Sequence, residues 1–83
     1  MKNYTASATL SDNTIVSIIV TVNTNNINIA VTVLSKGYYT ASKQYRKTIA
    51  KSERFDDMYI VKIIQNEVES IANSSEYKID FNF

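Results

Sequence analysis

The first third of the chain alternates between apolar and polar residues with a period of two. The alternation runs through residues 4–10 (YTASATL), 14–22 (TIVSIIVTV) and 27–33 (INIAVTV). Successive side chains of a strand point to opposite faces, so each segment is expected to be a strand with one buried face. The segments between them, 11–13 and 23–26, are rich in turn formers. This pattern predicts an antiparallel meander of three strands.

The end of the chain carries a helix pattern followed by a further strand pattern. Between residues 57 and 72, apolar residues recur at spacings of three and four, as in an amphipathic helix. They are Ile60, Val61, Ile64, Val68, Ile71 and Ala72. Asp56 is suited to cap the first turn, and residues 73–75 end the helix. Residues 77–83 (YKIDFNF) alternate again and are expected to return to the sheet.

Residues 38–52 fit either a helix or a strand. As a strand they would place Lys43, Tyr45, Lys47 and Ile49 on one face, mixing charge with apolar bulk. As a helix they separate the two, which favours the helix. The sequence therefore predicts a single α+β domain, 1–83, with an antiparallel four-stranded sheet and helix packed on one face. The expected order is β-β-β-α-α-β, with β-β-β-β-α-β as the alternative.

The composition excludes several classes of chemistry. The chain has no cysteine and no histidine, which removes disulfides, thiolate metal sites and the commonest general base. It has one glycine, so it cannot contain a glycine-rich phosphate-binding loop. These absences predict a protein that is not an enzyme and that uses neither a cofactor nor a metal.

The expected location is cytoplasmic, without membrane association. The N-terminus lacks the pattern of a signal peptide, and the longest apolar-rich run, residues 15–22, is too short to span a bilayer. The chain is rich in Asn, Ile, Lys and Ser, with one Gly and no Pro. This bias is typical of AT-rich genes, and it favours an accessory protein of a phage or mobile element.

One face of the predicted sheet has no helix to cover it. Its residues are Thr5, Ser7, Thr9, Ile15, Ser17, Ile19, Thr21, Asn28, Ala30 and Thr32. An antiparallel sheet can face water on one side, so one interpretation is a solvated face with two tolerated isoleucines. The other is an interaction surface with Ile15 and Ile19 at its centre, on which Ile15, Ile19 and Thr21 are the candidate contact residues. Its partner would be another protein or a second copy of the chain, forming a homodimer.

The segment 36–54 is strongly basic. Six basic side chains against one acidic side chain give it a net charge of +5, whereas residues 55–83 carry −4. Its candidate contacts to nucleic acid are Lys43, Arg46, Lys47, Lys51 and Arg54, with Tyr38 or Tyr39 stacking on bases. Against this, the whole chain carries only +1. Glu67 or Glu69 facing Lys47 or Lys51 would also neutralise the segment within the fold.

The sequence therefore leads to two hypotheses of function. The first is a small non-enzymatic accessory protein that acts through protein–protein contact. The alternative is a nucleic-acid-binding module that uses the basic segment 36–54.

Overall fold

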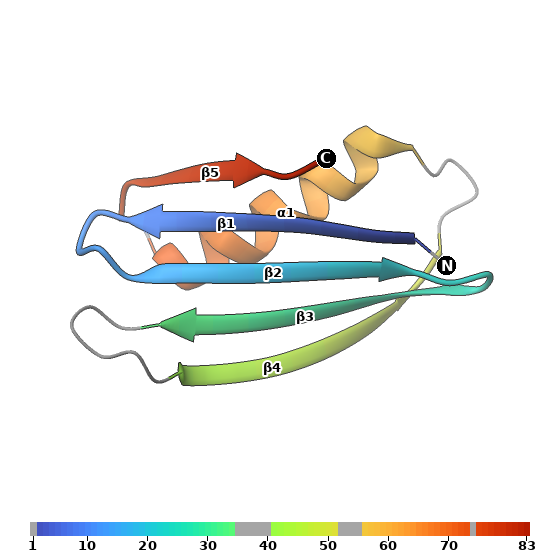
Figure 1. Cartoon of the computed structure of the whole chain (residues 1–83), viewed down its shortest axis with the longest axis horizontal. Helices are drawn as coiled ribbons and strands as arrows, with labels where there is room; N and C mark the ends of the chain where they lie inside the picture. The colour runs from blue at the N-terminus through green and yellow to red at the C-terminus, as the bar shows by residue number, and fades with distance from the viewer. Residues whose placement is uncertain (1, 35–40, 52–55, 74) are drawn as a thin grey trace.

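A computed structural model describes residues 2–34, 41–51, 56–73 and 75–83. In chain order the elements are β1 (Lys2–Leu10), β2 (Ile15–Val22), β3 (Asn26–Leu34), β4 (Ala41–Ala50), α1 (Asp57–Ala72) and β5 (Tyr77–Phe81). The strands form one layer, and α1 crosses behind it (Figure 1). The fold is α+β, as expected from the sequence.

The five strands form one antiparallel sheet in the order β4-β3-β2-β1-β5. The meander β1–β2–β3 is confirmed, and β5 returns to the sheet beside β1 (Figure 1). The first turn depends on asparagine, because Asn13 has φ 68°, in the left-handed region that this residue tolerates. The Asp12 carboxylate accepts a hydrogen bond from the Thr14 N–H at 2.9 Å. In the strand order given above, β2 is the central strand of the sheet.

The expectation of a helix over residues 38–52 is wrong where the structure describes them. Residues 41–50 form β4, which pairs with β3 from Asn26↔Ala50 to Leu34↔Ala41, with an irregularity between Val33 and Leu34. The sheet therefore has five strands rather than four, with one helix rather than two among the described residues. The observed order is the alternative, β-β-β-β-α-β.

The mixed face of β4 is tolerated because α1 packs mainly on β1, β2 and β5. Lysine side chains on β4 can lay their methylene stems along apolar surface and keep the ammonium group near water. Pairing with β4 also satisfies the backbone groups along the outer edge of β3, which a helix could not do. These two tertiary effects outweigh the cleaner charge separation of a helix.

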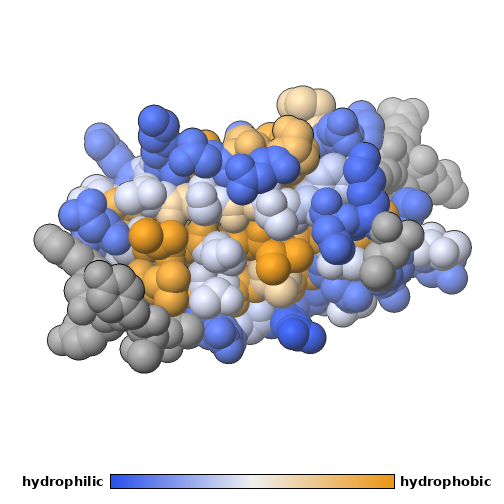
Figure 2. Space-filling view, in the orientation of Figure 1, coloured by the Kyte–Doolittle hydropathy of each residue, from blue (hydrophilic) through white to orange (hydrophobic). Residues whose placement is uncertain are grey.

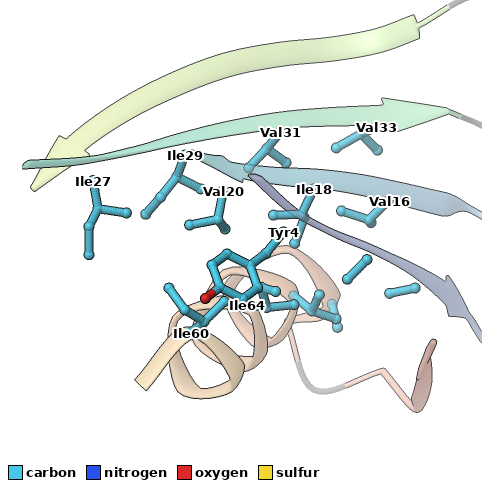
Figure 3. Close-up of a cluster of buried hydrophobic side chains, with 14 of the residues drawn as sticks. Tyr4, Val16, Ile18, Val20, Ile27, Ile29, Val31, Val33, Ile60 and Ile64 are labelled. Atoms are coloured by element: carbon cyan, nitrogen blue, oxygen red, sulfur yellow. The ribbon is translucent and has the colours of Figure 1, made fainter. Parts of the chain in front are cut away.

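The core lies between α1 and the inner face of the sheet (Figure 3). Its largest fully buried side chains are Ile18, Ile27, Ile60, Ile64, Val16, Val20, Val31 and Val68. Burying one such side chain contributes about 1.5–3 kcal/mol. The apolar residues that alternate along the strands and those that recur every three or four residues along α1 thus pack together in one core.

Both predicted ends of α1 are confirmed. The Asp56 carboxylate accepts a hydrogen bond from the Tyr59 N–H at 2.9 Å. At the other end Asn73 is left-handed, with φ 48°, and its N–H donates to the Glu69 carbonyl. Within the described ranges, α1 included, no helix has the length and apolar character needed to cross a membrane.

Candidate protein-interaction face

The face of the sheet turned away from α1 is called the open face. The strand registers place the following described residues on it: Asn3, Thr5, Ser7, Thr9, Ile15, Ser17, Ile19, Thr21, Asn28, Ala30, Thr32, Leu34, Gln44, Arg46, Thr48, Lys78 and Asp80. Most are small and polar. Figure 2 shows this face, with separate apolar patches among paler side chains and a hydrophilic border.

Ile15 and Ile19 are the exposed apolar residues of the central strand. Their exposed fractions are 43% and 44%, whereas their β2 neighbours that point to the core, such as Ile18, are about 1% exposed or less. Four residues of strand separate them by about 13 Å. Ile15 pairs with Leu34 across the strands, and Ile19 pairs with Ala30. The open face therefore carries two apolar patches, with Ser17 between them.

The patch around Ile19 is hollowed. Ala30 lies between Ile19 on β2 and Arg46 on β4 in the cross-strand register. Because Ala30 extends only a methyl group, it leaves space between two longer side chains. Two hollows of about 480 and 350 Å³ are both lined by these three residues. A side chain that protrudes from a partner would find both apolar surface and a guanidinium group here.

A hydrogen-bonded polar row borders this end of the open face. The Thr21 hydroxyl donates to Oδ1 of Asn3 at 2.9 Å, and the Thr48 hydroxyl donates to Oδ1 of Asn28 at 2.8 Å. In both cases the oxygen of the asparagine accepts the hydrogen bond, which leaves its NH₂ group to donate to a partner. The row therefore offers the amide groups of Asn3 and Asn28 beside the Ile19 patch.

The predicted nucleic-acid residues that the structure describes do not all lie on one face of the sheet. Arg46 lies on the open face, whereas the register places Lys43 and Lys47 on the side of the helix. Lys51 is exposed just after β4. Tyr38, Tyr39 and Arg54 lie outside the described residues. The nucleic-acid hypothesis itself stays a prediction, with its described basic residues divided between two faces.

Glu67 neutralises part of the basic segment from within the fold. Its Oε1 lies 2.8 Å from the Nζ of Lys47, and its Oε2 accepts a hydrogen bond from the Tyr45 hydroxyl at 2.8 Å. The pairing of Glu67 with Lys47, one of those suggested by the sequence, is thus present. Partial burial and the neighbouring carboxylate of Glu67 raise the pKa of Tyr45 to about 12. Tyr45 is therefore a neutral donor near pH 7.

A cleft of about 690 Å³ lies between β4 and α1, lined by Val33, Lys43, Tyr45, Lys47, Ser70 and Ile71. The buried carboxylate beside it, Glu67, has both oxygens engaged. Across the described ranges no three Asp or Glu side chains gather in a way that could hold a metal ion. The cleft therefore lies beside the Glu67–Lys47 ion pair and the Tyr45–Glu67 hydrogen bond.

The sequence interpretation missed Arg46 and Asn3 as open-face residues. A helix over residues 38–52 would have grouped Arg46 with Lys43 and Lys47, whereas the strand turns it to the opposite face. Asn3 continues the odd-numbered positions of β1. Extending the alternation by one residue at the start of the chain would have found it.

Comparison with known proteins gives no match for this chain among family models, curated proteins or solved structures. The fold and the open face are therefore the basis for proposing a function.

Proposed function

We propose that this chain is a non-enzymatic binding protein that contacts a protein partner through the open face of its sheet. The observation that carries the proposal is the exposure of Ile15 and Ile19, 43% and 44%, on the central strand of the sheet, on the face that α1 does not cover. On the ground of its composition, the proposal also includes that the chain is an accessory protein of a phage or mobile element.

The size of the open face supports a specific contact. The strands β1 to β4 have eight to ten residues each and are about 26–33 Å long, whereas β5 has five residues and is about 17 Å long. Side by side, the five strands span about 24 Å. The face therefore presents about 600–800 Å². A specific protein–protein interface buries about 800 Å² on each partner, so one partner could cover the whole face.

The composition of the face supports a protein partner in particular. An apolar side chain could enter the hollows beside Ile19 and Ala30, and a carboxylate next to it could meet the guanidinium of Arg46. Base stacking would require aromatic rings on the face, and the open-face residues of the described strands include none. The short Thr, Ser and Asn side chains lose little entropy when they are ordered in a contact. These features favour a partner with a protruding apolar residue flanked by an acidic residue.

The proposal is tested by comparing what three forms of the protein capture from extracts of its source cells. The forms are the wild type, the double variant Ile15→Lys/Ile19→Lys, and the control Gln65→Lys/Asn66→Lys. The control makes the same change in charge at exposed positions of α1. Circular dichroism melting of each form verifies that it folds.

The expected result is that the wild type and the control capture the same proteins, while the open-face variant loses them. Equal capture by all three forms, or no specific capture by the folded wild type, would refute the proposal. The comparison uses the wild type and control as references, so the identity of the partner need not be known in advance.

A further inference from the structure

We propose that β5 is a self-complementary edge through which two copies of this chain pair antiparallel, joining their sheets into one. The surface involved is the outer edge of the sheet, not the open face. β5 is the last strand in the sheet order, and no described strand pairs with its outer side (Figure 1).

The backbone of β5 determines which groups point outward. The Ser11 N–H donates to the Glu76 carbonyl at 2.9 Å, and the Asn82 N–H donates to the Thr5 carbonyl at 3.0 Å. Residues of one antiparallel strand alternate between pairing inward and outward. The even-numbered residues of β5 therefore bond to β1, and the N–H and C=O groups of Tyr77, Ile79 and Phe81 point away from the sheet.

A second β5 meets these groups in register when the two-fold axis passes beside Ile79. Ile79 then pairs with Ile79 of the second copy, and Tyr77 pairs with its Phe81. Each such pair exchanges two hydrogen bonds, because all three residues present both of their backbone groups outward. The edge thus matches itself with no outward group of β5 left unused.

The side chains match in the same register. On the open face, Lys78 of one copy lies directly across from Asp80 of the other, and the symmetry repeats the pair. Within the described ranges, neither of these two side chains has a hydrogen bond or ion pair in the single chain. On the helix side the same pairing brings together Tyr77, which is 38% exposed, and Phe81, which is half-buried. Cross-strand aromatic pairs stabilise sheets.

The opposite edge of the sheet, formed by β4, is not self-complementary in charge. β4 carries Lys43, Arg46 and Lys47 and no acidic residue. Two copies of β4 would therefore place like charges side by side, and lysines at an edge are a common protection against such pairing. The charge pattern leaves β5 as the edge that accepts a second copy.

The pairing is tested by sedimentation velocity across micromolar to millimolar concentrations, because an interface this short is expected to be weak. The wild type should pass from monomer to dimer as its concentration rises. Asp80→Lys places two lysines across from each other and should keep the chain monomeric. The double variant Lys78→Asp/Asp80→Lys restores opposite charges in the same register and should dimerise like the wild type. Melting curves verify that each variant folds.

The place of the contact is tested by oxidation of single-cysteine variants, which is possible because the natural chain has no cysteine. Ile79→Cys should form a disulfide-linked dimer much faster than Gln65→Cys, which lies on the exposed side of α1. A wild type that stays monomeric, a folded Asp80→Lys variant that dimerises as the wild type does, a charge swap that fails to restore the dimer, or equal oxidation at both positions would overturn the proposal. Ile15→Lys/Ile19→Lys should still dimerise, which separates this proposal from the one for the open face.

Discussion

The hydroxyl of Tyr45 on β4 donates a hydrogen bond to Oε2 of Glu67 on α1 at 2.8 Å. The other carboxylate oxygen of Glu67 lies 2.8 Å from the Nζ of Lys47, also on β4. Although α1 packs mainly on β1, β2 and β5, these two contacts also connect it to β4, the edge strand on the opposite side of the sheet from β5. They also explain how Glu67, a residue that is only 8% exposed, is accommodated beside the core.

Replacing Glu67 should destabilise the protein through Tyr45 more than through Lys47. Glu67→Ala removes the partner of a half-buried hydroxyl and should cost about 1–3 kcal/mol. Glu67→Gln keeps an acceptor for Tyr45 and should cost less than about 1 kcal/mol, because the Lys47 side chain is 51% exposed and exposed ion pairs contribute little. Urea unfolding of the two variants measures the difference. Equal losses of stability would contradict this assignment.

Tyr45 should make the protein sensitive to high pH. Its pKa is raised to about 12 in the folded chain, against about 10 in an unfolded one. A raised pKa contributes stability that is complete below about pH 10 and is lost as the pH rises towards about 12. Spectroscopic titration of the six tyrosines at 295 nm should show a late-titrating group that Tyr45→Phe removes. A variant that titrates as the wild type does would show that another tyrosine is responsible.

The core and the open face should respond differently to the loss of an isoleucine. Ile64 is fully buried, so Ile64→Ala leaves a cavity and should cost about 2–5 kcal/mol. Ile15 is 43% exposed, so Ile15→Ala should cost less than about 1 kcal/mol. Denaturant midpoints measured under the same conditions provide the comparison. A large loss for Ile15→Ala would mean that the open face is covered in the folded protein.

The elements that could be predicted from the sequence are those whose pattern agrees with their surroundings. β1, β2 and β3 each bury one face and expose the other, so the alternation of residues such as Ile18 and Ile19 reports burial directly. The ends of α1 were equally predictable, since Asp56 and Asn73 act within one turn of the chain. These features can be predicted from neighbouring residues alone, without knowing how the rest of the chain folds.

The assignment of β4 depended on contacts that are distant in the sequence. Its face mixes Lys43, Tyr45 and Lys47, a pattern that a strand tolerates here because Glu67, twenty residues beyond Lys47, supplies the matching carboxylate. Its pairing with β3 is likewise non-local. Ile15 and Ile19 were placed correctly on the uncovered face, whereas Arg46 could be placed there only once β4 was known to be a strand.

The division of the basic residues leads to a prediction about nucleic acid. With Arg46 on one face and Lys47 paired to Glu67 on the other, we expect no detectable binding of single- or double-stranded oligonucleotides at about 50 mM salt, where phosphate contacts are strong. Fluorescence anisotropy with labelled oligonucleotides measures this. Binding that Arg46→Ala and Lys43→Ala both weaken would favour the alternative function.

The proposal that the open face is the binding surface is tested most directly by photo-crosslinking from single positions. A photoreactive phenylalanine analogue replaces Ile19 in one variant and Gln65, on the exposed side of α1, in another. On irradiation in source-cell extract, the account predicts a specific protein adduct from position 19, competed away by excess unlabelled wild type, and none from position 65. Adducts from position 65 with none from position 19 would contradict it.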